Sequence, residues 1–353
     1  MITKDLLVIR VTLVMGLLFS ASLLMAENAE ESSISLSNSD SDWTMPRTEY
    51  GKPNLQGEWW FGSRTPFQRR SVLGEQKVFS IDQVKAIESD MLQRNIDLAE
   101  PLDPNRRAPE VGSVIRQEAD DNFLSHYQEP ELVAINGQYL TSVVTSPSNG
   151  RINRNDNFQD FYAQRKATGL SATDGPEGQP LSGRCLSFGS ALPSLTPIMM
   201  NPNIQIVQTR DHVMIMAEMV HDARIVKLDS DHPNNGIKKW MGDSVGYWEG
   251  DTLVVYSQNF RPEQSSMRSF PMSDRFEVVE RYTLLSDNEI HFAFEVKDPL
   301  SLIEPVSGER LLTRNSPADR IYEFACHEGN YSLANILRGA RQQELDQRGV
   351  SDK

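Results

Sequence analysis

The strongest constraint on the fold is a strict alternation of residue types toward the C-terminal end of the chain. In residues 289–297, EIHFAFEVK, apolar side chains occupy every second position from Ile290 to Val296, and mostly polar side chains lie between them. Successive side chains of a strand point to opposite faces, so this alternation predicts a strand with one buried and one solvated face. Such strands are typical of antiparallel sheets. The segment therefore indicates a mainly β fold.

Other short runs have the composition of strands and are separated by turn residues. They are IQIVQ from Ile204, HVMIMAEM from His212, ARIVKL from Ala223, SVGYWEGDTLVVYS from Ser244, RFEVVERYTLL from Arg275 and RIYEFA from Arg320, with earlier segments at 53–60 and 133–144. The tripeptides 249–251 and 286–288 lie between neighbouring runs, as hairpin turns do. Strands joined in this way predict an antiparallel meander, either closed as a barrel or arranged as a lipocalin-like sandwich.

Two helices are expected beside the sheet. Ser80 and Gln83 have the spacing of a capping box, which predicts a helix near 80–98. Asn330 is expected to cap a second helix near 331–347, in which Leu333 and Ile336 share one face with other apolar residues. The predicted fold is therefore mainly β with flanking α-helices.

The N-terminal residues 1–26 have the composition of a secretory signal peptide. Lys4 and Arg10 are followed by an apolar run of about 15 residues, shorter than the roughly 20 that span a bilayer. An uncleaved anchor is the alternative for this segment. Residues 27–45 are rich in Ser, Asn and acidic residues and predict a disordered leader. Residues 46–348 are then expected to form one β-rich domain, secreted or periplasmic, with no membrane span after signal removal.

The acidic charge balance limits the classes of partner. The formal net charge is −14 at pH 7, and no basic stripe interrupts it. Binding to nucleic acid or to an anionic membrane needs a basic footprint, so neither partner is expected. A small-molecule ligand remains compatible with this composition.

The chain has two cysteines, Cys185 and Cys326. In an oxidising compartment two thiols tend to pair, which predicts a disulfide between them. It would close a loop of about 140 residues, worth about 4–5 kcal/mol in the chain-entropy model. A catalytic thiol is less favoured, because on a strand His327 would point away from Cys326. No paired C-x-x-C or H-x-x-H motif is present, so neither a metal nor a cofactor is predicted.

Residues 242–246, GDSVG, match the G-x-S-x-G pattern of a nucleophile elbow. An elbow needs an apolar strand before the serine and a helix after it. Here a polar segment precedes Ser244 and a predicted hairpin follows. A turn that leads into a strand is therefore favoured over a serine hydrolase.

His221 and Asp222 form the most polar group between two predicted strands, with Arg224 two residues further on. An imidazole beside a carboxylate could act as a general base or contribute to a metal site. A hydrogen-bonded turn is the favoured interpretation, with Asp222 and Arg224 on one face as a possible ion pair. The alternative gives His221 and His327 acid–base roles, oriented by Asp222 or Glu328.

Several long blocks resemble an uncharacterised family of secreted bacterial proteins. The blocks are MVHDARIVKLD, WMGDSVGYWEGDTLVV, VVERYTLL and YEFACHEGNYSLANILRGAR, with GRCLSFGSALP and PNLQGEWW extending the resemblance toward the N-terminus. The sequence departs from the family pattern at Tyr256, where an acid is usual, and at Phe324, where tyrosine is usual. The resemblance implies the envelope of a Gram-negative bacterium and no particular reaction.

The recurring pieces of these blocks supply the candidate site residues. Candidates for ligand binding are Arg184, Arg224, Trp248 and Glu249. The favoured function is binding of a small neutral or apolar molecule, for which the tryptophans near turns suit the mouth of a barrel. The first alternative is a hydrolase, lyase or isomerase that uses the acid–base residues named above. The second is an envelope interaction protein without pocket chemistry.

Overall fold

The computed structural model describes residues 43–99, 105, 107, 131–156, 169–186, 192, 201–261, 270 and 272–349. The predicted signal peptide lies outside these ranges. The predicted leader also lies outside them, apart from residues 43–45. The described residues all belong to one compact unit, Asp42–Lys353.

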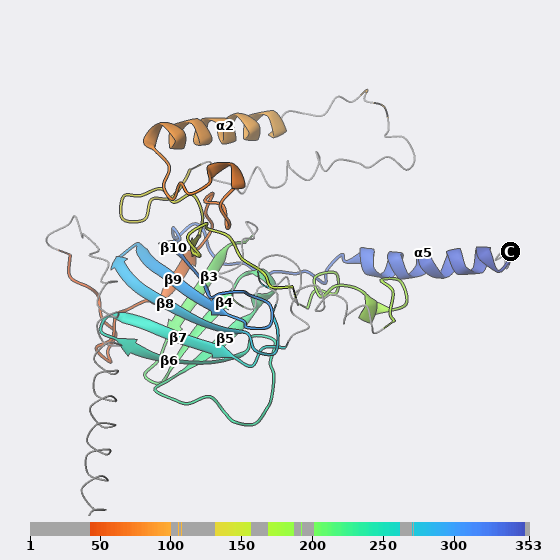
Figure 1. The fold of residues 1–353 in the computed structure, drawn as a ribbon. Helices are drawn as coiled ribbons and strands as arrows, with labels where there is room; N and C mark the ends of the chain where they lie inside the picture. Colours follow the sequence, from red (N-terminus) through yellow and green to blue (C-terminus); the bar gives the residue numbers. More distant parts are fainter. Residues whose placement is uncertain are drawn as a thin grey trace, which may run out of the picture. The chain divides into compact units, whose positions relative to one another are not determined.

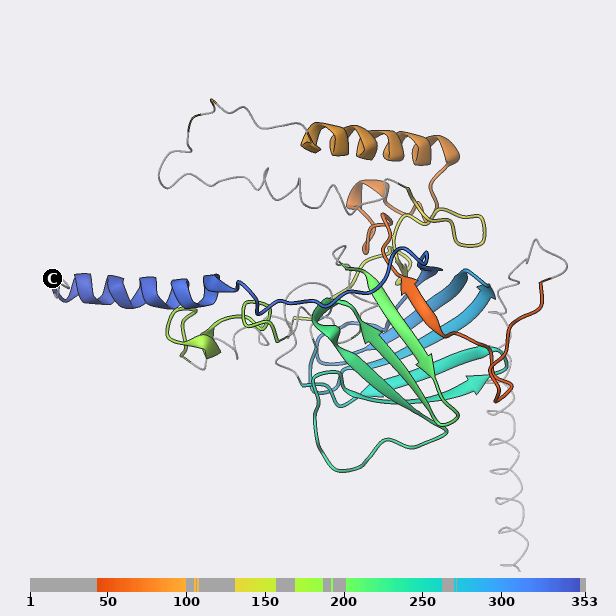
Figure 2. The ribbon, with the colours of Figure 1, turned by 180° about the vertical axis from the view of Figure 1, so that it is seen from behind.

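The described strands form a ten-stranded sheet, nine strands of which close into a barrel (Figure 1, Figure 2). The tenth strand, β2, pairs with β10 outside this circle. The order is β1-β3-β4-β5-β6-β7-β8-β9-β10, and β1 pairs with β10 to complete the circle. The strands are β1 (Gly57–Trp60), β2 (Val144–Ser146), β3 (Asn203–Gln208), β4 (His212–Ala217), β5 (Ala223–Leu228), β6 (Asp243–Glu249), β7 (Thr252–Gln258), β8 (Glu277–Ser286), β9 (Glu289–Lys297) and β10 (Val306–Arg314). The mainly β prediction with a barrel as one of its forms is confirmed.

The alternation that opened the sequence analysis lines the barrel. Ile290, Phe292, Phe294 and Val296 of β9 are each at most 3 % exposed. Their cross-strand partners on β8 and β10 point to the same side, so the barrel interior is filled by side chains from facing strands. Burial of this apolar face is the main driving force that the sequence offers for folding.

Both predicted hairpins are present. The β6–β7 turn lies at Glu249–Thr252, where Gly250 adopts φ +57°, a left-handed conformation that suits glycine. The β8–β9 turn lies at Ser286–Glu289. The prediction of a purely antiparallel meander is wrong at one place, because β5 and β6 are parallel. Parallel neighbours need a longer crossover than a tight turn, and residues 229–242 provide it.

The strand β10 was not predicted. One part of β10 pairs with β2 through Ser307 and Gly308, and the other pairs with β1 through Thr313 and Arg314. The closing contact between β1 and β10 therefore covers only two register pairs. The residues of β10 that close the barrel, Thr313 and Arg314, are therefore different from those that hold the outside strand β2, Ser307 and Gly308.

The helix α2 (Ile81–Ala99) begins as predicted. The Ser80 hydroxyl accepts a hydrogen bond from the Gln83 amide at 3.2 Å, and the Gln83 side chain accepts one from the Ser80 amide at 2.9 Å. This reciprocal pair is a capping box. The helix packs Val84 against a small cluster that contains Phe79 and Leu132.

The helix α5 (Tyr331–Gln347) also occupies the predicted residues. None of its residues is buried, and Ile336 on its apolar face is 44 % exposed. Asn330 precedes the helix but its side chain does not cap it. The Asn330 amide group instead donates to the Gly183 carbonyl at 3.2 Å and to the Cys185 sulfur at 3.4 Å.

Two predicted strands are absent from the described structure. Residues 133–144 form isolated bridges, such as Ile135 with Gln138, and only Val144 enters a strand. Residues 320–325 are not a strand either, because carboxylates rather than a neighbouring strand hold their backbone. Glu58 accepts from the Ile321 amide and Glu218 accepts from the Tyr322 amide, each at 3.2 Å. Three short 3-10 helices complete the described elements: Ser71–Leu73, Pro176–Gly178 and Met219–His221.

Candidate functional site

The barrel interior contains a charged pair from facing strands. Arg224 of β5 donates to both carboxylate oxygens of Glu280 of β8, at 2.6 and 2.9 Å. Their side chains are 1 % and 0 % exposed. Burial alone would lower the pKa of Arg224, but the charge of Glu280 outweighs it and raises that pKa. The predicted ion pair of Arg224 with Asp222 is therefore wrong, because Arg224 points inward to another acid.

Hydroxyl groups complete this pair. Tyr282 donates to Glu280 at 3.0 Å, and Arg224 donates to the Ser257 hydroxyl at 3.3 Å. The Ser257 hydroxyl lies 2.7 Å from that of Ser244. Ser244 is thus part of a strand and a buried hydrogen-bond network, in agreement with the rejection of the nucleophile elbow. Both carboxylate oxygens of Glu280 therefore already accept hydrogen bonds, one from Arg224 and the other from Arg224 and Tyr282.

A second buried arginine, Arg310 of β10, has a different environment. It is 4 % exposed, and within the described residues it forms no ion pair. Its Nη1 donates to the Phe61 carbonyl at 3.1 Å, its Nε has no hydrogen-bond partner, and its guanidinium lies 5.7 Å from the centre of the Phe67 ring. Burial lowers the pKa of Arg310 to about 10. The described interior therefore contains a guanidinium without an anion.

Aromatic rings cluster at the end of the barrel opposite the two hairpin turns, and one of them, Phe67, contacts Arg310. We call this end, which contains Phe67, Phe270, Phe276 and Phe294, the aromatic end. Phe67 stacks on Phe294 at 6.3 Å between centroids and meets Phe270 edge-on at 5.7 Å. Phe294 is buried, whereas Phe67 and Phe270 are half-buried. The apolar interior therefore continues to a partly exposed aromatic surface.

The hairpin end of the barrel, at the turns 249–252 and 286–289, is closed by side chains. Trp59 is fully buried there, with the Arg314 guanidinium 4.1 Å from its ring centre. Arg314 donates to the Asp287 carbonyl at 2.6 Å, and Trp43 donates to the Asp287 carboxylate at 3.1 Å. The hairpin end is thus covered by side chains, whereas Phe67 and Phe270 at the aromatic end stay half-buried.

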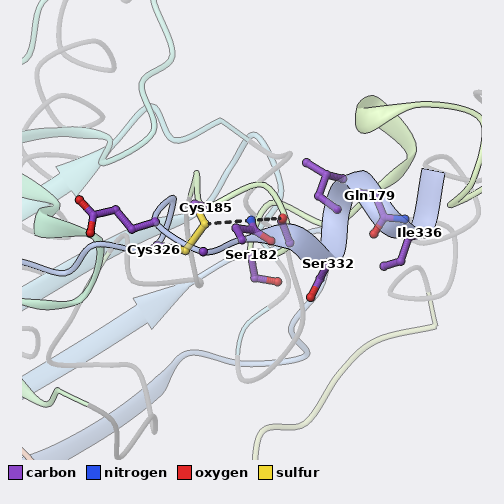
Figure 3. A pocket seen from close by; sticks show the side chains of 11 residues that line it. Gln179, Ser182, Cys185, Cys326, Ser332 and Ile336 are labelled. Carbon is purple, nitrogen blue, oxygen red and sulfur yellow. Dashed lines mark hydrogen bonds between the residues drawn. A yellow bond between two sulfur atoms is a disulfide. The ribbon is translucent and has the colours of Figure 1, made fainter. Parts of the chain in front are cut away.

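The predicted disulfide between Cys185 and Cys326 is present, with 5.7 Å between the Cα atoms. It lies beside a cavity of about 340 Å³ that is bordered by the first turns of α5. Figure 3 shows Ser182 next to the disulfide, and Gln179 and Ile336 farther along the cavity. Two further cavities, of about 360 and 410 Å³, lie beside Pro299 and Pro317. None of the three is lined by Trp, Phe or Met, the side chains expected around an apolar ligand.

The candidate acid–base residues lie in two neighbouring segments. His221 is exposed and has φ +43°, directly after Val220 at φ +61° in the β4–β5 connection. Met219 and Val220 pack against Phe324, so this connection adjoins the segment that leads to His327. His327 and Glu328 are also exposed. Of the catalytic candidates, only Glu328 borders the disulfide cavity, and Asp222 is half-buried elsewhere in the β4–β5 connection.

The remaining ligand-binding candidates lie in different places. Trp248 of β6 is half-buried against the core, and its indole nitrogen has no partner within the described residues. Glu249 lies on the outer surface, where it is paired with Arg281. Arg184 is half-buried next to the disulfide. These residues and Arg224 do not gather around one described cavity, and their proposed role in binding stays a prediction.

A polar cluster that was not predicted from the sequence lies on the outer face of β6. The buried carboxylate of Asp243 contacts Lys239 at 2.5 Å and His232 at 3.1 Å. Burial tends to raise the pKa of Asp243, but the hydrogen bonds from Lys239 and His232 lower it below its ordinary value. The spacing of Lys239 and Asp243 could have indicated a local ion pair. The partner His232 could not be recognised, because the crossover between β5 and β6 brings it there.

Within the part of the chain that the structure describes, no three side chains of His, Cys, Asp or Glu come together in a way that could hold a metal ion. None of the helices in the described ranges combines the length and apolar composition that crossing a bilayer requires.

Comparisons with known proteins leave the site to be interpreted from its own geometry. No protein-family model, curated protein or solved structure matches the chain. The resemblance to a family of secreted bacterial proteins therefore stays a prediction.

Proposed function

We propose that this protein is an extracytoplasmic binding protein that binds a small, largely apolar molecule against the half-buried rings at the aromatic end of its barrel. The observation that carries the proposal is the pair of half-buried rings, Phe67 and Phe270, packed over the buried Phe294. Binding sites for small molecules are mostly apolar and aromatic, with a few polar groups, and often lie in the mouths of barrels. The other end of this barrel is closed by Trp59 and Arg314.

The disulfide supports the proposed compartment. Disulfides persist mainly in oxidising compartments, and Cys185 is joined to Cys326. The composition of residues 1–26 independently indicates export. Together they favour the periplasm or the extracellular space over the cytoplasm.

The proposal is tested by titrating the protein with phenylnaphthylamine, a neutral apolar dye that fluoresces when it leaves water. We expect saturable binding to the wild type and at least fivefold weaker binding to Phe67→Ala. The expected change corresponds to about 1 kcal/mol, a small part of what a buried aromatic ring contributes. Wild-type protein that does not bind the dye saturably would overturn the proposal.

A matched control is needed because the dye has a second apolar surface to occupy. Ile336 on α5 is 44 % exposed and could bind the dye without any barrel site. We expect Ile336→Ala to bind as the wild type does. If Ile336→Ala weakens binding and Phe67→Ala does not, the dye occupies α5 and the barrel is not the site.

A further inference from the structure

We infer that the molecule bound at the aromatic end carries an anionic group, such as a carboxylate, sulfonate or phosphate, that pairs with the guanidinium of Arg310. This inference rests on the proposed function and specifies its ligand as an amphiphile. The sequence alone favours a neutral or apolar ligand, and the guanidinium of Arg310, unpaired among the described residues, is the reason to add a negative charge to that ligand.

The two arginines of the barrel interior lie in contrasting environments. Arg224 forms two short hydrogen bonds with Glu280, so its charge is compensated. Arg310 is almost as deeply buried, but its described partners are the neutral Phe61 carbonyl and the Phe67 ring. A buried charge is costly unless it is paired, and its pKa of about 10 reflects this cost.

Glu280 already pairs with Arg224, and the described residues show no ion pair between Glu280 and Arg310. Its two oxygens accept from Arg224, and one also accepts from Tyr282. The rings of Tyr282 and Phe292, with centroids 5.0 Å apart, occupy the adjacent inner positions on β8 and β9. Phe292 is the cross-strand neighbour of Arg310. The charge of Arg310 is therefore left for a group that the described residues do not provide.

The place of Arg310 in the fold brings its guanidinium close to the aromatic end. Arg310 lies on β10 between the residues that pair with β2 and those that pair with β1. Its free Nε lies close to the aromatic end, since the same guanidinium contacts Phe67. An anionic group at Arg310 would leave the rest of the ligand against Phe67, Phe270 and Phe294. Arginine suits this role because its planar donors match the oxygens of a carboxylate or phosphate.

The negative net charge of the chain does not prevent an anion from pairing with Arg310. The formal net charge is −14, but exposed acidic side chains are screened by water and salt. At physiological ionic strength the screening length is about 8 Å, so distant surface acids weaken the approach of an anion only slightly. A direct contact with a buried guanidinium is screened much less.

A pair of dyes with the same ring system tests the inference directly. Phenylnaphthylamine is neutral, and anilinonaphthalene sulfonate adds one negative group to it. We expect the wild type to bind the sulfonate about tenfold or more tightly than the neutral dye, because a hydrogen bond to a charged group contributes about that much. In Arg310→Met we expect the sulfonate to lose about tenfold in affinity and the neutral dye to stay within about twofold.

Two further variants serve as controls. Arg310→Lys keeps the charge without the planar fork, and we expect it to retain part of the preference for the sulfonate. Arg47→Met removes an exposed arginine paired with Asp251 at the hairpin end, and we expect no change in either affinity. Equal loss in Arg47→Met and Arg310→Met would mean that the effect is one of overall charge, and would overturn the inference.

The outcomes separate the inference from the proposed function. If both dyes bind the wild type equally and Arg310→Met changes neither, the barrel is an apolar site and the inference is wrong. If neither dye binds, the proposed function fails as well. Removing a buried charge that has no partner should not destabilise the fold, so an Arg310→Met protein that does not fold, or melts more than about 10 °C below the wild type, would show that groups of the chain already compensate Arg310 and would also overturn the inference.

Discussion

At the scale of single residues, buried charged side chains have the largest consequences for stability and binding. Arg224 and Glu280 are both buried, and each compensates the other. Such a pair can contribute little net stability, yet removing one partner exposes the cost of the remaining charge. A single substitution in this pair should therefore lower the free energy of unfolding strongly.

The change Arg224→Met is expected to lower the free energy of unfolding by about 3–5 kcal/mol, because it leaves Glu280 ionised and buried. Urea unfolding followed by circular dichroism measures this loss. The double variant Arg224→Met/Glu280→Leu is the control, and it should recover most of the lost stability. Equal stability of the wild type and Arg224→Met would mean that the pair is not buried as described.

Tyr256 provides a test that depends on pH. Burial, together with a hydrogen bond from its hydroxyl to Glu277, raises the pKa of Tyr256 from 10.0 to about 12. The difference between ultraviolet titrations of the wild type and Tyr256→Phe should therefore show one phenol with a midpoint near 12. Because the pKa is raised on folding, the associated stability is fully present below pH 10 and is lost as the pH rises through about 12.

A midpoint at or below 10 would show that Tyr256 is solvated and not bonded to Glu277. The result also bears on the resemblance described above, since related sequences are expected to have an acid at this position. A second acid beside Glu277 would face like-charge repulsion, whereas a phenol can donate a hydrogen bond to it.

At the scale of elements, the sequence predicted those strands and helices whose signal is local. The alternation in 289–297 and the spacing of Ser80 and Gln83 each identify an element without knowledge of its neighbours. The strand β10 was missed because its sequence, VSGERLLTR, places Glu309 and Arg310 on opposite sides of one strand. Both faces of β10 are partly buried, so the usual alternation of polar and apolar residues is absent. Residues 320–325 were wrongly predicted as a strand for the opposite reason. Their composition is typical of a strand, but no neighbouring strand pairs with their backbone.

The helix α5 is attached to the rest of the chain by few interactions. It has no buried residue, and its described links are the disulfide, the contacts of Asn330, and hydrogen bonds from Arg341 to the carbonyls of Thr173 and Asp174. We expect the double variant Cys185→Ser/Cys326→Ser to increase amide exchange across 326–347 at least tenfold while exchange in β7–β9 stays unchanged. Exchange that rises equally in the barrel strands would show that the disulfide stabilises the whole domain instead.

At the scale of the whole molecule, closure of the barrel lay beyond the sequence. Trp59 pairs with Arg314 and Trp60 with Thr313, contacts between residues far apart in the chain that no local pattern encodes. The parallel pairing of β5 with β6 likewise depends on the path of the crossover at 229–242. The residues of the candidate site likewise divide into those that a local motif identifies and those that only the closed barrel brings together. Arg224 was singled out by its motif, whereas Arg310, Phe67 and Phe270 come together only once the barrel closes.

The central claim is that a small amphiphile binds in the barrel at its aromatic end. Hydrogen–deuterium exchange of the wild type, with and without saturating anilinonaphthalene sulfonate, tests it most directly. We predict protection of segments 60–67, 272–278 and 292–297 and of β10 around Arg310, with little change at the hairpin turns 249–252 and 286–289. Protection confined to α5, or to the segment around His221 and His327, would contradict the account.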